Sequence, residues 1–598
     1  MKDFVKMTLA VLCGLFIAGI LGFFFFFAMV GAMAASGSKT TVLPREGILD
    51  IDMSTFVLGE QSQEAAPSFN LSSIGGEMTP TIGILDASAA LRAAAADPGV
   101  KLALLRVDGA AAGIASIQEF RAALQEYRRS GKALVAYTES PGNGSYYLAT
   151  AADKIFSTSC HGGQISLLGL SGRLIFLKDL LDRLGVNVQL IRHGKYKSAG
   201  EMFIRNSSSP ENYEQNKVMV ESIWKAFASD IAEARGISVE QLNSIIDNLE
   251  LNFPEDLKEK GLVDELFTRE ELIVKLADLA VISDKKNLHL IPFVDYVSAK
   301  VHPATGKALK NQVAVIFAEG DIVDGNDDKG VAGNRFARII AKVREDDAVK
   351  AVVLRVNSPG GSVLASEKIK NELDLLKEKK HLIASYGDYA ASGGYWISNN
   401  CEKIYSDATT LTGSIGVFSM IPDFSRTVKD VAHVNITSVP TNKHSDMFSL
   451  MRPFDADEIA YMQASIEDIY DKFVGIVSEG RSLTREHVDS VAQGRVWTGS
   501  DALGIGLVDE IGTLEDAIAY AASLAGYVSK DDYSVVSYPK PKSMMETVME
   551  MLGQKSGPDE LSILAGTPFE GLSDGLRRLR DNEPAKVYAT IPYAIAIR

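Results

Sequence analysis

The chain has 598 residues, which is too long for one ordinary hydrophobic core, so two or more domains are expected. Its composition is that of a globular protein, with 46% hydrophobic and 23% charged residues. The formal net charge is -16 and no dense basic run occurs, which argues against a nucleic-acid partner. Three cysteines without a CxxC motif and eight scattered histidines indicate neither a disulfide framework nor a metal site, and no cofactor is expected.

The first 35 residues predict a membrane anchor. Residues 8–35 are uncharged and mostly apolar, and they are numerous enough to cross a bilayer as a helix. A cleaved signal peptide, with Ala32-Met33-Ala34 as the cleavage site, is the alternative, but its apolar region would be much shorter. Lys2 and Lys6 precede the span and favour a cytoplasmic N-terminus. The rest of the chain is therefore predicted to lie on the extracytoplasmic side.

Strands then alternate with helices. Residues 36–80 are predicted to form a linker with a first strand, and the first folded unit is predicted at 81–283. Its opening elements are expected to be a strand at 81–85, an alanine-rich helix at 87–96, a buried strand at 101–107, a helix at 114–130 and a strand at 133–137. Such alternation is typical of a parallel sheet covered by helices, so the fold class is α/β.

The sequence contains an internal repeat. The matching pairs are Lys101–Val107 with Lys350–Val356, Val135–Tyr137 with Ala384–Tyr386, and Lys154–Ser157 with Lys403–Ser406. All three share an offset of 249 residues, which predicts two copies of one fold unit without gaps over this core. We place the second copy at 312–530, after a polar linker at 284–311 and before a tail at 531–598 whose last stretch, 587–597, is apolar.

The second copy contains a candidate nucleophile. A buried strand at 351–356 runs into Asn357-Ser-Pro-Gly-Gly-Ser362, and about thirty residues later another strand runs into Ala391-Ser392-Gly-Gly394. Ser392 sits among small residues, and the N–H of Gly393, with that of Gly360 or Gly361, could hold an oxyanion. Either stretch alone reads as an ordinary glycine-rich turn, but the two together at this spacing are more specific.

At the same offset the first copy lacks this chemistry. Ser392 aligns with Asn143, and the glycine turn at 358–361 aligns with Gly109-Ala-Ala-Ala112. Ser145 lies nearby but out of register. A first-copy nucleophile is therefore not expected.

These motifs, together with Thr412-Gly-Ser-Ile-Gly416, Tyr196-Lys197-Ser-Ala199, Val496-Trp-Thr-Gly-Ser500 and Gly506-Leu-Val-Asp-Glu510, resemble the signal peptide peptidase A (protease IV) family in its long, duplicated form. The resemblance covers roughly residues 80–530. It implies two tandem Clp/crotonase-like α/β repeats and a serine peptidase that uses a Ser-Lys dyad. It also implies cleaved signal peptides in the membrane as substrates and a homo-oligomer, a tetramer, as the assembly.

The resemblance assigns the dyad residues to different copies. Ser392 of the second copy would be the nucleophile and Lys197 of the first copy the general base, although a lysine in such a loop is more often simply solvated. The second copy has its own lysine, Lys443, near the corresponding place, and single-domain relatives take both residues from one copy. Lys443 is therefore a rival base, but its neighbours are polar and would not by themselves lower the pKa of an amine.

Three other functions remain open from the residues. A Clp-like Ser-His-Asp protease would need a placed histidine, for which His433 and His444 follow Ser392 without a triad motif. A crotonase-type acyl-CoA enzyme would share the glycine turns but would not need the lysine. A non-catalytic scaffold would be expected to lose Ser392 or Lys197, and both are present.

Overall fold

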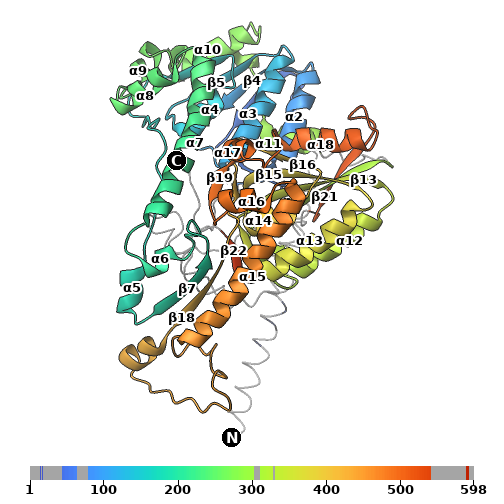
Figure 1. Ribbon diagram of the computed structural model, residues 1–598. Helices are drawn as coiled ribbons and strands as arrows, with labels where there is room; N and C mark the ends of the chain where they lie inside the picture. Colours follow the sequence, from blue (N-terminus) through green and yellow to red (C-terminus); the bar gives the residue numbers. More distant parts are fainter. Residues whose placement is uncertain are drawn as a thin grey trace, which may run out of the picture.

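The computed structural model describes residues 43–63, 79–283, 285–301, 310–327, 330–540 and 587–590, with residues 14, 17 and 20 standing alone before them. The predicted anchor at 8–35 therefore lies almost entirely outside the described residues, as does the methionine-rich stretch 544–551. Over the part of the chain that is described, no helix combines the length and apolar character needed to span a bilayer. The described chain forms two α/β units joined by a mixed sheet (Figure 1).

The first unit is built on a parallel sheet with the strand order β8-β6-β5-β4-β1-β9. Its strands are β1 (Gly47–Asp52), β4 (Val100–Arg106), β5 (Leu134–Thr138), β6 (Lys154–Thr158), β8 (Glu265–Phe267) and β9 (Leu290–Pro292). Its helices are α2 (Ile84–Ala96), α3 (Ile114–Arg129), α4 (Asn143–Ala149), α5 (Lys178–Arg183), α6 (Glu201–Ile204), α7 (Pro210–Arg235), α8 (Val239–Asp247), α9 (Pro254–Glu259), α10 (Arg269–Leu279) and α11 (Phe293–Lys300). The α/β prediction is confirmed.

The second unit repeats this plan. Its main sheet has the order β19-β17-β15-β13-β10-β21, with β16 paired to β15 and β20 paired to β16. Its strands are β10 (Gln312–Glu319), β13 (Val349–Ser358), β15 (His381–Ala391), β16 (Lys403–Ser406), β17 (Leu411–Gly413), β19 (Val496–Thr498), β20 (Glu510–Ile511) and β21 (Ser534–Tyr538). Its helices are α12 (Gly333–Glu345), α13 (Val363–Lys377), α14 (Gly393–Ser398), α15 (Ala456–Arg481), α16 (Arg485–Val491), α17 (Gly499–Gly504) and α18 (Leu514–Leu524).

Two further sheets are present in the described residues. β2 (Val57–Gly59) pairs with β3 (Thr81–Gly83). The third sheet has the order β12-β11-β14-β22-β18-β7 and takes strands from both units. Its strands are β7 (Asn187–His193), β11 (Ile322–Val323), β12 (Val331–Ala332), β14 (Gly360–Ser362), β18 (Val417–Asp423) and β22 (Tyr588–Thr590).

The structure assigns elements to two segments that were predicted to be a linker and a tail. β9 pairs with β1 and α11 packs into the first core through Phe293 and Tyr296, so 290–300 belongs to the first unit. In the tail, β21 extends the second sheet beside β10 and β22 joins the third sheet. Short strands of this kind carry too little local pattern to be distinguished from loops, because their neighbours come from distant parts of the chain.

The duplication holds, but not without shifts. Arg106 lies opposite Tyr137 and Arg355 lies opposite Ser385, so the central strand is displaced by one residue from the common offset. The helix after this strand keeps the common offset, because Tyr146 of α4 donates to Leu262 O and Tyr395 of α14 donates to Leu507 O in the matching Gly-Leu-Val-Asp-Glu segments, so Asn143 stands where Ser392 stands in the second copy. The gapless alignment is therefore wrong by one residue along β15 but right at the nucleophile, because the segment from Ser385 to Ser392 has one residue more than its first-copy counterpart and restores the offset. The conclusion that the first copy has no nucleophile there is unaffected.

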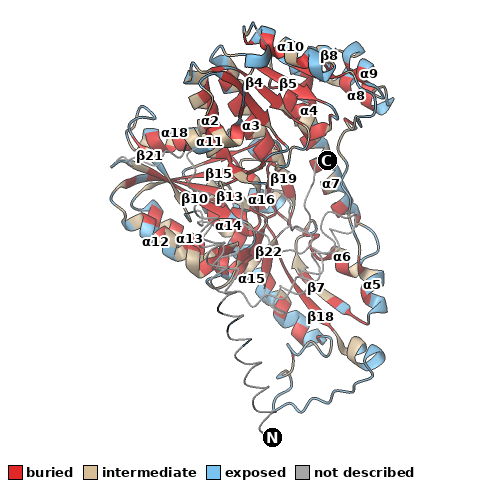
Figure 2. Ribbon diagram, turned by 180° about the vertical axis from the view of Figure 1, so that it is seen from behind, coloured by how far each residue is buried: buried red, intermediate tan, exposed pale blue. Residues whose placement is uncertain are grey.

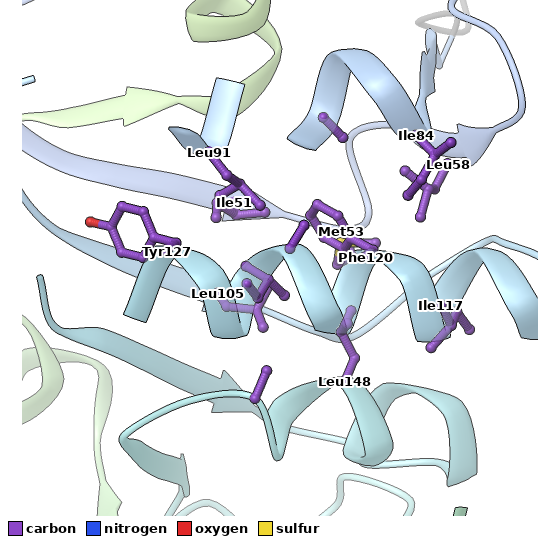
Figure 3. Packing of buried hydrophobic residues seen from close by; sticks show 14 of the residues in the cluster. Ile51, Met53, Leu58, Ile84, Leu91, Leu105, Ile117, Phe120, Tyr127 and Leu148 are labelled. Carbon is purple, nitrogen blue, oxygen red and sulfur yellow. The ribbon is translucent and has the colours of Figure 1, made fainter. Parts of the chain in front are cut away.

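One hydrophobic core runs through both units. It joins side chains of the first sheet to Val313, Val315 and Val353 of the second sheet and to α18. In the first unit, Ile117, Phe120 and other side chains of α3 pack against the first sheet (Figure 3). Red, buried ribbon is accordingly continuous from one unit to the next in Figure 2.

A buried arginine crosses the same interface. The Arg355 side chain on β13 is 1% exposed and pairs with Glu60 at 2.7 Å and Glu119 at 2.6 Å, both from the first unit. Gly387 has to be glycine because a Cβ there would lie 2.3 Å from a Glu60 carboxylate oxygen. Nearby, Asp388 accepts the backbone N–H of Ala115, at the start of α3. The two copies are thus held in one relative position by charge-assisted contacts as well as by apolar packing.

We predict that Arg355→Met lowers the free energy of unfolding by about 3–5 kcal/mol, because Glu60 and Glu119 would stay buried without their cation. The matched control is Arg106→Met. Arg106 occupies the same position in the first copy, but its side chain is 40% exposed, and water can replace part of its ion pairs. The control substitution should lower the free energy of unfolding by about 1 kcal/mol. Urea unfolding followed by tryptophan fluorescence measures both, and equal losses would contradict the prediction.

Candidate active site

The site lies where an antiparallel ladder joins the two copies. β7 of the first unit pairs with β18 of the second, with His193 opposite Val417 and Asn187 opposite Asp423. Lys197 comes four residues after β7 ends, and Ser414 comes three residues before β18 begins. Because the strands are antiparallel, the end of one meets the start of the other, and the lysine loop lies beside Ser414.

Lys197 and Ser392 meet there, as the resemblance implied. The amino group of Lys197 lies 2.8 Å from Ser392 Oγ, although the two residues are 195 positions apart in the chain. It also donates to Ser414, whose Oγ is 3.0 Å and whose carbonyl oxygen is 3.2 Å from Lys197 Nζ. Ser414 was recognised only as part of a motif and not as a site residue. Both side chains are buried, Lys197 being 2% and Ser392 0% exposed.

Ser392 occupies a sharp strand-to-helix turn. It follows β15 directly and precedes the first residue of α14, with φ 55° and ψ -110°. For a residue other than glycine this backbone conformation costs of order 1–3 kcal/mol, so the surrounding contacts must impose it. Its N–H donates to Gly413 O at 2.8 Å, and its carbonyl accepts the N–H of Trp396 at 2.8 Å. The turn fixes the direction in which the hydroxyl points.

Two glycines form the wall behind Lys197. A Cβ at Gly494 would lie 2.6 Å from Lys197 Cβ, and a Cβ at Gly416 would lie 2.7 Å from Gly494 and 3.2 Å from Lys197 Cδ. Gly494 also has φ +78°, which other residues rarely adopt. The protein backbone thus closes around the lysine stem and keeps water away from it. Gly416 belongs to a motif read from the sequence, whereas Gly494 was missed, although it lies just before the Val496–Ser500 motif.

Burial determines the charge of this lysine. Removal from water holds the pKa of Lys197 well below its usual value of 10.5. The hydrogen-bond partners of the amino group, Ser392 and Ser414, are uncharged, so they give the ammonium form no ionic compensation. A neutral amine 2.8 Å from a hydroxyl is placed to accept its proton.

The lysine loop is held by its own framework. The side-chain amide of Gln215 on α7 donates to Tyr196 O at 3.1 Å and to Ser198 Oγ at 3.0 Å. The oxygen of the same amide, Oε1, accepts the N–H of Val496 in the second unit. Arg192 donates to Lys197 O at 2.6 Å. These contacts tie the loop to α7, β7 and β19 at once, which leaves the amino group little freedom to move.

The three predicted oxyanion glycines lie around one end of α14. Gly393 is the first residue of that helix, where the N–H is not used by the helical hydrogen-bond pattern. Gly360 and Gly361 form β14 with φ values of 104° and 156°, and the Gly360 N–H donates to Ser358 Oγ at 3.2 Å. A Cβ at Gly394 would lie 2.7 Å from Ser358 O, so α14 packs directly on this turn.

The rival residues lie elsewhere. The Lys443 side chain is 65% exposed and pairs with Asp457 at 2.5 Å, and this hydrogen bond raises the pKa of Lys443. His444 bonds to Glu458 at 2.8 Å, and His433 lies in an exposed segment. In the first copy, Ser145 caps α4 by accepting the N–H of Gly142 at 2.8 Å. Ser392 therefore meets a lysine and not a histidine, and the lysine is not Lys443.

The comparison with known families decides the class of protein. The profile of peptidase family S49 matches residues 126–283 and 374–527, once in each copy. The chain belongs to peptidase family S49. Protease 4 of Haemophilus influenzae is 33% identical over 564 residues, covering 92% of this chain and 91% of its own, and Protease 4 of Salmonella typhi is 33% identical over 595 residues, covering 95% and 94%. The chloroplastic serine protease SPPA of Arabidopsis thaliana is 30% identical over 488 residues, or 79% of this chain and 72% of its own.

The S49 assignment confirms the family resemblance and the prediction of a serine-type peptidase. Both profile matches fall on the repeated α/β units, so the duplication is a property of the whole enzyme fold. A crotonase-type acyl-CoA enzyme and a non-catalytic scaffold have no support from these relatives.

The lowered pKa of Lys197 predicts a pH-dependent stability that can be measured without substrate. Between that pKa and 10.5 the unfolded chain binds one more proton than the folded chain at this residue, so the free energy of unfolding rises with pH by about 1.4 kcal/mol per unit. Methionine does not titrate, so Lys197→Met has no such difference in proton binding between the folded and unfolded chains. The variant should be more stable than the parent at pH 7, and the difference should shrink by that slope as the pH is raised towards 10.

Urea unfolding of both proteins at several pH values between 7 and 10 measures the difference. The matched control is Lys443→Met, which removes an exposed lysine and should leave the slope unchanged. A constant difference between Lys197→Met and the parent across this range would mean that Lys197 is not held neutral by burial.

Proposed function

We propose that this S49 peptidase is a membrane-anchored endopeptidase that degrades cleaved signal peptides with a dyad of Ser392 and Lys197. The observation that carries the proposal is the 2.8 Å contact between Lys197 Nζ and Ser392 Oγ inside a buried site. Burial lowers the pKa of Lys197 and so favours the form that can accept a proton, and the strained turn fixes the direction of the serine hydroxyl. No cofactor or metal is needed for this chemistry.

The reaction follows from the positions of the groups. Neutral Lys197 takes the hydroxyl proton while Ser392 Oγ attacks the peptide carbonyl. The N–H of Gly393, with that of Gly360 or Gly361, stabilises the oxyanion, and one such donor is typically worth about 3 kcal/mol of barrier. The protonated lysine then gives its proton to the departing amine. Water, deprotonated by Lys197, hydrolyses the acyl-enzyme.

Ser414 has a positioning role in this scheme. Its hydroxyl and carbonyl oxygens accept from the Lys197 amino group, which directs the remaining lone pair or proton towards Ser392. The Ser414 backbone is itself fixed, with φ 50° and its N–H donating to Arg495 O at 2.7 Å. The residue thus sets the direction of proton transfer without touching the substrate.

The cellular setting follows from the N-terminal sequence and the family. We place the chain in the bacterial cytoplasmic membrane, anchored once by residues 8–35, with both repeats outside the cytoplasm. The repeats are assigned to the Clp/crotonase-like class of α/β folds and the assembly to a homo-tetramer, as the family resemblance implies. Apolar signal peptides released into the same membrane are the substrates that this location supplies. General proteolysis of misfolded proteins is the alternative function.

The dyad predicts a specific pattern of losses. Ser392→Ala and Lys197→Ala should each reduce hydrolysis of an apolar peptide by at least about a thousandfold, and the double variant should lose little more, because the two residues act as a unit. Lys443→Ala should retain most of the activity. Activity of the parent should fall as the pH drops through the lowered Lys197 pKa, since the ammonium form cannot accept a proton.

Initial rates with a fluorogenic peptide measure these effects, and circular dichroism checks that each variant is folded. Near-normal turnover of Lys197→Ala combined with loss in Lys443→Ala would exclude a site shared between the two copies. A fluorophosphonate, which phosphonylates an activated serine with loss of fluoride, should label Ser392 in the parent and should not label Ser392→Ala.

The membrane topology is tested in cells. Protease added to intact spheroplasts should digest both repeats, because they are predicted to lie outside the cytoplasm, while a cytoplasmic marker stays intact. A chain that is protected until the spheroplasts are lysed would reverse the topology. Release of the chain from washed membranes by high salt would instead contradict anchoring by residues 8–35.

A further inference from the structure

The third sheet contains a slot one strand wide beside the dyad. Its middle strand is β22, at residues 588–590, and the strands on either side are β14 and β18. β14 carries Gly360 and Gly361, and β18 begins three residues after Ser414. Without β22, two strand edges would face each other across about 10 Å, the width needed for one extended chain that pairs with both. The slot is therefore built from the two segments that complete the active site.

The tail fills this slot in register. Gly360, Gly361 and Ser362 lie antiparallel to Thr590, Ala589 and Tyr588, and the Val363 N–H donates to Val587 O at 3.4 Å. On the other side Tyr588 pairs with Phe418 of β18. β22 also lies against α14, the helix that starts immediately after Ser392 (Figure 1). A segment near the C-terminus thus takes the path of an extended peptide through the site.

The Tyr588 side chain is held in an apolar pocket. It is 9% exposed, and its ring centroid lies 6.3 Å from that of Phe418. The other buried members of this cluster come from the first unit and from β18: Leu177, Leu181, Val186, Val188, Ala199, Phe203 and Met420. Phe418 also lies under the dyad lysine, with Lys197 Nζ 5.9 Å from its ring centroid. The pocket is therefore part of the same site, and it accepts a large apolar or aromatic side chain.

The sequence of the tail resembles the proposed substrate in its chemistry. Residues 587–597, Val-Tyr-Ala-Thr-Ile-Pro-Tyr-Ala-Ile-Ala-Ile, carry no charge and are almost wholly apolar. A cleaved signal peptide has the same character. A groove that selects uncharged extended segments by strand pairing and one apolar pocket would bind both.

We propose that residues 587–590 are a built-in competitor that occupies the peptide groove, with Tyr588 in the pocket that selects a large apolar substrate side chain. The proposal rests on the proposed peptidase function. A substrate must displace the segment before it can pair with β14 and β18, so the apparent affinity is reduced by the fraction of molecules in which the groove is free. The segment lowers activity towards weakly binding chains and yields to apolar peptides that fill the pocket better.

Two variants of the full enzyme test this. Tyr588→Asp places a charge in the apolar pocket and should expel the segment, and a chain ending at Lys586 removes it. If the groove is filled nine times in ten, the KM for a fluorogenic apolar peptide should fall by about tenfold in both variants, with kcat unchanged. Tyr461→Asp is the matched control, because Tyr461 is 69% exposed on α15 and should leave KM as in the parent.

A synthetic peptide of residues 585–594 provides a measurement that does not depend on how the variants fold. It should inhibit the truncated enzyme competitively, and the same peptide with Asp in place of Tyr588 should inhibit it far less. Unchanged KM in both variants, non-competitive inhibition, or equal potency of the two peptides would overturn the proposal. So would mass spectra showing that the purified parent has already lost residues 588–598, since the segment would then be a substrate.

The outcomes separate the two proposals. If the parent and the truncated enzyme hydrolyse the peptide with the same KM, and Ser392→Ala does not, the peptidase function stands and the competitor is excluded. If neither hydrolyses it and Ser392 is not labelled by a fluorophosphonate, both proposals fail.

Discussion

The antiparallel pairing of β7 with β18 is the interaction on which the active site depends. In this pairing a strand of the first repeat is hydrogen-bonded to a strand of the second in a defined register. Strand register is strict, because a slip of one residue would turn every side chain to the opposite face. Lys197 and Ser414 lie just beyond the ends of this ladder, and its register therefore sets where the lysine amino group meets Ser392.

The two residues of the proposed dyad come from different repeats. The second keeps the strand-to-helix turn with Ser392 and the glycines of β14, while the first has Asn143 at the corresponding position and carries Lys197. Such a division works only if the repeats cannot move apart. A common apolar core, and Arg355 buried between Glu60 and Glu119, hold them together. The surrounding framework offsets the free-energy cost of burying the Lys197 amino group and of holding Ser392 at φ 55°.

The groove and the dyad share their parts. β14 supplies glycine N–H groups and one edge of the slot, and β18 supplies the other edge and the ring of Phe418 beneath Lys197. A peptide that pairs with both strands is thereby aligned with the serine by main-chain hydrogen bonds, which are independent of sequence. Discrimination is left to the apolar pocket, where first-repeat side chains contribute most of the wall. In the proposed enzyme, each repeat thus contributes to the groove as well as to the dyad.

Much of this protein follows from its sequence alone. Alternating strand and helix patterns predict the two parallel sheets, because apolar periodicity is a local property, and motifs around Ser392 and Lys197 identify the family. The repeat is visible, although its gapless alignment misplaces strand β15 by one residue, since loop lengths leave no periodic signal. The features that only the tertiary structure decided are contacts between residues far apart in the chain. The choice of Lys197 over Lys443 depends on the β7–β18 ladder, and the role of Gly494 depends on backbone approaching a side chain 297 residues earlier. The position of residues 588–590 in the groove likewise depends on strands more than 160 residues away, because hydrogen-bond partners in a sheet are set by the fold and not by neighbours in the chain.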